Sequence, residues 1–153
     1  MKSIQTKIRL KKKKKMMNVI NHVFYMDETT INFSGDKNDT YFKVIENSFT
    51  SAISGKSNLS DEIKKMKGLS GRKFRVMIND LIKNFEEPKY LEIGSWLGAS
   101  ACAVCFNNKV NITCIDNWSQ NFSTNLDSKK IFKSNIKKFT TENIALQIIE
   151  EDF

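Results

Sequence analysis

The stretch that decides the fold is Tyr90-Leu-Glu-Ile-Gly-Ser-Trp-Leu-Gly98, in which a short apolar run leads into two glycines. Residues 90–93 have the composition of a short strand, and the small residues over 99–106 are typical of a closely packed helix. Gly94 allows a turn that a Cβ would obstruct, and Gly98 allows helix and ligand to approach closely. The start of the helix offers unpaired N–H donors. The sequence therefore predicts a strand, a turn and a helix that together cradle a ligand.

Two more strands and another helix are predicted after this unit. Residues 110–115 are β-branched and lead into Asp116, and residues 144–149 have a similar character. Between them, apolar residues recur at helical spacing over 126–139. The resulting β-α-β-α-β order over residues 89–153 predicts an α/β fold with a Rossmann-like parallel sheet and right-handed crossovers.

The region before the sheet, residues 18–88, is predicted to be a small helical region. A stripe of apolar residues favours a helix over 41–53, and Ser60 is a good N-cap for a second helix that stops at Gly68. A third helix is predicted from residue 70 or 71 to Phe85, before Pro88. Its apolar face is expected to carry Phe74, Met77, Ile78, Leu81 and Phe85, and its solvated face Arg72, Lys73 and Arg75.

The net charge of +8 is concentrated at the N-terminus. Residues 1–15 hold eight of the 25 basic side chains and no acid, so that residues 16–153 carry 17 basic and 17 acidic side chains. Such a run of like charges favours a basic, disordered leader over residues 1–17. A nucleic-acid-binding domain would carry its excess charge on a folded face, so nucleic acid is an unlikely partner. Binding of a polyanion by the leader stays an alternative.

The other side chains with possible chemistry give weaker signals. The three cysteines are an odd number, which does not suit a disulfide framework, and the cytoplasm is the expected compartment. Cys102 and Cys105 fall on the predicted helix of small residues and are expected to be buried thiols, so no metal site is predicted. His22 has no predictable partner. The apolar runs are far shorter than the ~20 residues needed to cross a bilayer, so we expect no membrane partner.

The expected ligand follows from Glu92, Asp116 and the glycine spacing. Asp116 lies 22 residues beyond Gly94, where a carboxylate can accept both hydroxyls of a ribose. The spacing is G-x-x-x-G, and Trp96 stands where a dinucleotide site needs its second glycine, which counts against NAD. Glu92 precedes Gly94 by two residues, and a carboxylate there suits a ligand with an ammonium group, as in a methionine moiety.

These residues resemble a known family. Glu92-Ile-Gly-Ser-Trp-Leu-Gly98 resembles the E-x-G-x-x-x-G form of the first motif of class I S-adenosylmethionine-dependent methyltransferases, and Ile115-Asp-Asn-Trp118 resembles their second motif. The resemblance covers about residues 68–153. Residues 68–75 are also similar to an element that lies over the cofactor cleft in the small-molecule branch. The resemblance implies S-adenosylmethionine as cofactor, bound by Glu92, Gly94, Ser95, Trp96, Gly98, Asp116, Asn117, Trp118 and Asp152.

The resemblance also implies a role for each of these residues. The two glycines would shape the turn around the methionine half of the cofactor, and Glu92 would meet its ammonium group. Asp116 would take the ribose hydroxyls. The acid after the third strand, Asp152 or alternatively Glu151, would accept a hydrogen bond from the adenine amino group, and Trp118 is placed to pack against the adenine.

The sequence departs from the family in its length. The family's fold continues beyond the third strand, so the chain is expected to be a truncated or split product, whose sheet a homodimer or a second polypeptide completes. The implied reaction is methyl transfer to an oxygen or nitrogen nucleophile of a small molecule, and no catalytic residue is assigned. The alternative is a non-catalytic module that uses the cleft to bind the cofactor or a partner.

Overall fold

The computed structural model describes residues 6–8, 31–120 and 126–152. The chain divides into two compact units, residues 1–46 and residues 47–153. Most of the basic leader lies outside the described residues, as does His22.

The first unit contains an antiparallel pair of short strands. β1 (Thr6–Ile8) pairs with β2 (Ile31–Phe33). The Asp39 side chain accepts a hydrogen bond from the backbone N–H of Phe42 at 2.8 Å, and so caps the start of α1 (Thr40–Ser54). Within this unit the rings of Phe33 and Phe42 meet edge to face, with centroids 6.4 Å apart.

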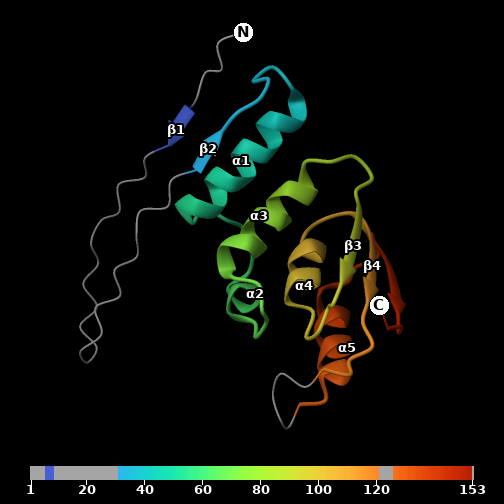
Figure 1. The fold of residues 1–153 in the computed structure, drawn as a ribbon. Helices are drawn as coiled ribbons and strands as arrows, with labels where there is room; N and C mark the ends of the chain where they lie inside the picture. The colour runs from blue at the N-terminus through green and yellow to red at the C-terminus, as the bar shows by residue number, and fades with distance from the viewer. Residues whose placement is uncertain (1–5, 9–30, 121–125, 153) are drawn as a thin grey trace, which may run out of the picture. The chain divides into compact units, whose positions relative to one another are not determined.

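The second unit is built on a parallel sheet of three strands (Figure 1). β3 (Lys89–Ile93), β4 (Val110–Ile115) and β5 (Ile144–Ile149) lie in this order, and both pairings are parallel. The crossovers run through α4 (Ala99–Cys105) and α5 (Ser128–Phe139). The unit is therefore α/β with a parallel sheet and crossover helices, which is compatible with the predicted Rossmann-like arrangement.

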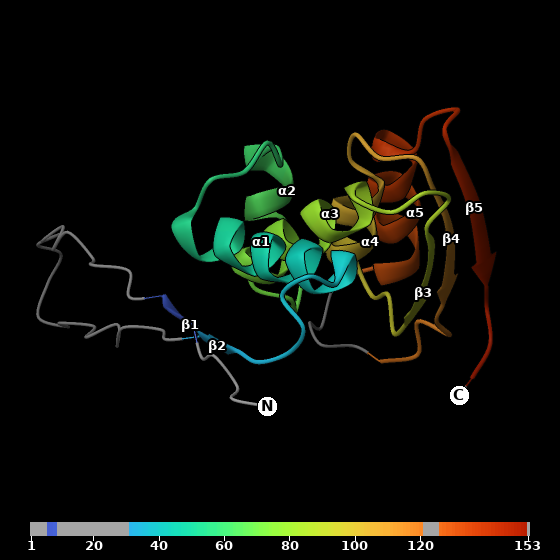
Figure 2. The ribbon, with the colours of Figure 1, turned by 90° about the horizontal axis from the view of Figure 1, so that it is seen from above.

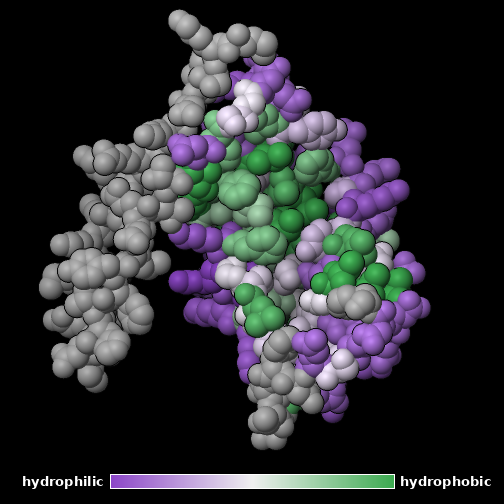
Figure 3. Space-filling model, viewed as in Figure 1, coloured by the Kyte–Doolittle hydropathy of each residue, from purple (hydrophilic) through white to green (hydrophobic). Residues whose placement is uncertain are grey.

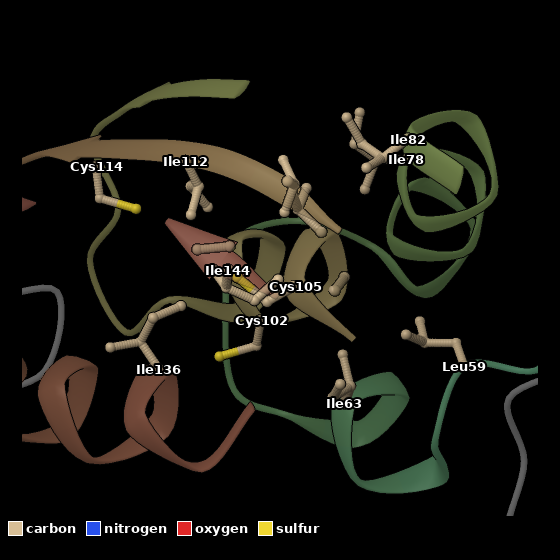
Figure 4. Close-up of a cluster of buried hydrophobic side chains, with 14 of the residues drawn as sticks. Leu59, Ile63, Ile78, Ile82, Cys102, Cys105, Ile112, Cys114, Ile136 and Ile144 are labelled. Carbon is tan, nitrogen blue, oxygen red and sulfur yellow. The ribbon is translucent and has the colours of Figure 1, made fainter. Parts of the chain in front are cut away.

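The helices of this unit lie on one face of the sheet (Figure 2). Because side chains alternate along a strand, Val110, Ile112 and Cys114 all point to that face and are buried. Six of the seven residues of α4 are buried, and Phe132 of α5 is fully buried. Figure 4 shows side chains of β4, α4 and α5 converging in this core.

The opposite face of the sheet is not covered by these helices. Leu91 and Ile93 are 59% and 56% exposed, and Ile93 is in register with Ile115 and, through it, with Ile149. Hydrophobic side chains accordingly gather on the surface over β3 and β4 (Figure 3).

Two helices precede the sheet, α2 (Asp61–Lys65) and α3 (Arg72–Lys83). The predicted N-cap is confirmed, since Ser60 accepts a hydrogen bond from the N–H of Ile63 at 3.2 Å. The helix that follows is shorter than predicted and ends at Lys65.

The predicted faces of α3 were wrong at two residues. Phe74 is 43% exposed, whereas Arg75, which was expected to face solvent, is only 3% exposed. Arg75 donates hydrogen bonds to the carbonyl oxygens of Ile63 and Met66, at 2.9 and 2.7 Å. The last carbonyl groups of a helix lack intrahelical partners, and the buried guanidinium donates to them here, to that of Ile63 in addition to the N–H of Met66. This requirement turns Arg75 inward.

The three cysteines, Cys102, Cys105 and Cys114, are free and buried. Burial raises the pKa of each thiol, to about 12 for Cys105 and Cys114. Across the described ranges, no group of three or more histidine, cysteine or acidic side chains is placed to hold a metal ion. In the same ranges, no helix combines the length and apolarity needed to span a bilayer.

Candidate functional site

The candidate site lies at the edge of the sheet where the three parallel strands end. The N–H of Gly94 donates to the carbonyl oxygen of Ile115 at 2.9 Å, and the N–H of Asp116 donates to that of Ile149 at 3.1 Å. These bonds align the three strand ends. The segments that begin at Gly94, Asp116 and Glu150 therefore leave the sheet side by side, as expected for a ligand site of an open α/β sheet.

The turn between β3 and α4 depends on its two glycines. Gly94 and Gly98 have φ values of +82° and +80°, in the left-handed region that favours glycine. A Cβ on Gly98 would also lie 2.9 Å from Cδ2 of Phe132. The N–H of Gly98 donates to the carbonyl oxygen of Ser95 at 2.7 Å, which closes the turn. Gly98 is therefore needed for two reasons: the left-handed backbone conformation and the close approach of Phe132.

The Glu92 carboxylate faces the helix side of the sheet and is 7% exposed. Its Oε2 accepts a hydrogen bond from Tyr90 Oη at 3.1 Å. Its Oε1 is buried and has no hydrogen-bond partner in the described part of the chain, and the same holds for Ser95 Oγ. Buried polar atoms are almost always hydrogen-bonded, so these two mark a place where a ligand with donor groups would complete the site.

The environment of Glu92 raises the pKa of its carboxyl group. Burial is the main cause, and the negative charge of Asp116 adds to it. The hydroxyls of Ser100, Ser95 and Tyr90 lie close enough to act in the opposite direction. The pKa is raised on balance, so this compensation is incomplete. A cation placed against the carboxylate would lower the pKa again.

Asp116 holds two turns together. Its Oδ2 accepts a hydrogen bond from the N–H of Trp96 at 2.7 Å, and its Oδ1 accepts one from the N–H of Trp118 at 2.6 Å. Both tryptophans have positive φ, +43° and +50°, a conformation that costs energy for a residue with a side chain. A carboxylate oxygen has two lone pairs, so Asp116 keeps acceptor capacity. Its role as a clamp was not predicted.

The two tryptophans brace the turns against the helices. The Trp118 indole donates to the carbonyl oxygen of Trp96 at 2.9 Å and packs on Phe132, with ring centroids 5.1 Å apart. The Trp96 indole donates to Ser128 Oγ at 3.2 Å. Lys67 Nζ lies 6.0 Å from the centre of the Trp96 ring. The structure therefore gives Trp118 a packing role in the core beside the ligand role that the sequence predicts.

The ends of β4 and β5 are joined by Asn117 and Asp152. Asn117 Nδ2 donates to Asp152 Oδ1 at 2.6 Å, and Asn117 Oδ1 accepts from the N–H of Ser119 at 2.9 Å. Of the two acids predicted for the third strand, Asp152 therefore reaches towards the end of the second strand. Glu150, which precedes both, pairs with Lys129 of α5.

The segment from Gly68 to Arg75 lies beside the glycine turn. A Cβ on Gly68 would be 2.5 Å from the Cβ of Ala99, the first residue of α4, so the segment passes directly over the start of that helix. Arg75 fixes it by donating from Nε to Ser70 Oγ at 3.0 Å. The sequence pattern gave no signal for this buried arginine, because its partners are mainly backbone carbonyls.

Comparison with protein-family models, with curated proteins and with solved structures gave no match.

Proposed function

We propose that the chain binds S-adenosylmethionine at the end of the parallel sheet and forms the cofactor-binding part of a class I methyltransferase. The methyl acceptor would be an oxygen or nitrogen nucleophile of a small molecule, and the compartment the cytoplasm. The proposal rests on one observation above all. Glu92 Oε1 and Ser95 Oγ are buried, without a hydrogen-bond partner among the residues that the structure describes, beside a turn formed by Gly94 and Gly98.

The residues of the turn fit the methionine half of this cofactor. An ammonium group carries three donors and a positive charge, and it would meet Oε1 of Glu92, which has no hydrogen-bond partner among the described residues, on a carboxylate whose pKa is raised mainly by burial. A pyrophosphate in the same place would face Glu92 with like charge. This contrast favours a cationic ligand over a dinucleotide.

The remaining residues of the edge have supporting roles in this proposal. Asp116 fixes the turn through the N–H of Trp96 and has lone pairs left for the ribose hydroxyls. Asn117 holds Asp152 at the end of β4, where it would accept a bond from the adenine amino group. The cofactor supplies a methyl group on a sulfonium centre, and the chain's share of the chemistry is to hold and orient it.

The first test is calorimetric titration of the full chain with S-adenosylhomocysteine, the product form of the cofactor, which keeps the ammonium group. We expect binding, and we expect Glu92→Gln to weaken it by about tenfold or more because the amide loses the charge that faces the ammonium. The same variant removes an unfavourable buried charge. Its free energy of unfolding should therefore be unchanged or higher, which separates lost binding from lost folding.

Glu142→Gln is the matched control, since it removes a carboxylate from an exposed position just before β5, at the opposite end of the sheet from the site. It should leave the affinity within about twofold. NAD serves as the control ligand. Binding of NAD in preference to S-adenosylhomocysteine, or no binding by a chain with folded circular dichroism, would refute the proposal.

The raised pKa of Glu92 predicts opposite effects of pH on binding and on stability. The folded chain holds the proton above the ordinary value of 4.5, whereas the unfolded chain releases it there. Raising the pH from 4.5 through the folded-state pKa therefore lowers the free energy of unfolding. Over the same window the carboxylate forms, so affinity for S-adenosylhomocysteine should rise. Titrations and urea denaturation at a series of pH values upwards from 4.5 measure both trends, and Glu92→Gln should abolish both.

A further inference from the structure

The outer edge of β5 presents unpaired backbone groups. The N–H groups of Val110 and Asp116, at the two ends of β4, donate to the carbonyl oxygens of Asn143 and Ile149. Since backbone groups alternate along a strand, the N–H and C=O groups of Leu146 and Ile148 point away from β4. No strand in the described part of the chain pairs with them. The edge is therefore free to accept another strand.

A groove with an apolar floor runs along this edge. It lies between β5 and α5, is lined by Ile136, Leu146, Ile148, Thr140, Lys133 and Lys137, and has a volume of about 480 Å³. Ile148 is 38% exposed within it. A strand added to β5 would place every second side chain in this groove, so apolar side chains are required there.

The positive charges beside the groove indicate the charge that an occupant should carry. Lys133 and Lys137 stand on its α5 side and form no ion pair in the described part of the chain, and no acid lines the groove. The occupant should therefore be an extended segment that combines apolar side chains with an acid on the same face. The end of β5 has this pattern, because Leu146, Ile148 and Glu150 alternate on the helix side of the sheet.

We infer that two copies of the chain pair antiparallel through β5, about a twofold axis at Gln147, to form a continuous six-stranded sheet. Leu146 of each copy then lies opposite Ile148 of the other. The outward N–H and C=O groups of these two residues form hydrogen bonds across the interface. The antiparallel direction of the two strands determines which charged side chains meet across the interface. α5 returns antiparallel to β5, so Lys137 lies towards the start of β5, where the antiparallel strand brings Glu150 of the second copy. Glu150 remains within reach of Lys129 on its own chain.

The pairing is independent of the proposed cofactor site, which lies where the strands end. Two strands and a groove bury less than the ~1,600 Å² of a standard interface, so we expect a weak dimer with a dissociation constant of about micromolar size. Sedimentation velocity of the full chain between about 1 and 200 μM should show a monomer–dimer equilibrium. A chain that stays monomeric throughout overturns the inference.

Two variants locate the interface. Ile148→Lys places a charge in the apolar groove and should raise the dissociation constant by about tenfold or more. Ala145→Lys adds the same charge to an exposed residue on the other face of β5 and should change it by less than about threefold. Circular dichroism checks that both remain folded. Equal effects of the two variants, or no effect of Ile148→Lys, would place the dimer interface elsewhere.

A charge exchange tests the direction of pairing. Lys137→Glu brings an acid against Glu150 of the second copy and should weaken the dimer by about tenfold, whereas Lys130→Glu, at an exposed residue outside the groove, should not. Adding Glu150→Lys to Lys137→Glu restores opposite charges and should recover most of the loss. A double variant no tighter than Lys137→Glu alone would rule out the antiparallel pairing.

Discussion

Replacing Asp116 with alanine is expected to lower the free energy of unfolding by about 3–5 kcal/mol. The substitution removes both acceptors that bind the N–H groups of Trp96 and Trp118. Two strained backbone conformations then lose the bonds that hold them. Urea denaturation followed by tryptophan fluorescence measures the loss, because the chain's two tryptophans are these same residues and both belong to the unit of residues 47–153.

Asp116→Asn and Asp152→Ala are the matched comparisons. Asparagine keeps the shape but has one acceptor oxygen, so it should retain part of the stability. Asp152 is exposed and accepts a single bond from Asn117, so its loss should cost less than about 1 kcal/mol. Similar free energies of unfolding for Asp116→Ala and Asp152→Ala would contradict the role of Asp116 in holding the two turns. Because Asp116 supports the fold, loss of ligand binding in its variants would not by itself identify a ribose contact, which is why Glu92→Gln is the functional test.

The second large effect is expected at Gly98. Gly98→Ala should destabilise the same unit by about 3 kcal/mol, of which about 1–2 kcal/mol comes from the left-handed backbone and the rest from contact with Phe132. The Cβ would lie 2.9 Å from the Phe132 ring, which is fully buried and cannot move away freely. The same urea titration measures this loss.

Gly55→Ala separates the two causes. Gly55 follows α1 with φ of +73°, but no atom lies within 4 Å of its Cβ position. This substitution should therefore cost only the backbone term, about 1–2 kcal/mol. If both alanine variants lose the same free energy, close packing at Gly98 is not the reason for its glycine.

Local patterns predicted the order of strands and helices along residues 89–153 well. The strands end where hydrophobic runs meet Gly94 and Asp116, and the structure ends β3 at Ile93 and β4 at Ile115. Ser60 was recognised as an N-cap because a cap depends on neighbours within one turn. Such features are encoded over a few residues, so sequence alone is sufficient for them.

Features that depend on distant partners could not be predicted in this way. Arg75 lies on the buried side of α3 because it satisfies carbonyl oxygens of Ile63 and Met66, nine and more residues away. The helical periodicity of apolar residues predicts instead that Phe74 is buried. At the candidate site, the motif predicts that Glu92 and Asp116 contact a ligand, which stays a prediction. It did not show that Glu92 Oε1 has no hydrogen-bond partner among the described residues, or that Asp116 accepts bonds from the N–H groups of both Trp96 and Trp118.

The three buried cysteines allow local opening of the fold to be measured by thiol labelling. Cys102 and Cys105 lie on α4 and Cys114 faces them from β4, so the thiols occupy the seam between helix and sheet (Figure 4). All three are at most 1% exposed, and a thiol with a raised pKa reacts slowly even where a reagent reaches it. Alkylation therefore requires α4 to lift from β4. The rate of thiol labelling in water, with no mutation and no denaturant, measures how often this seam opens.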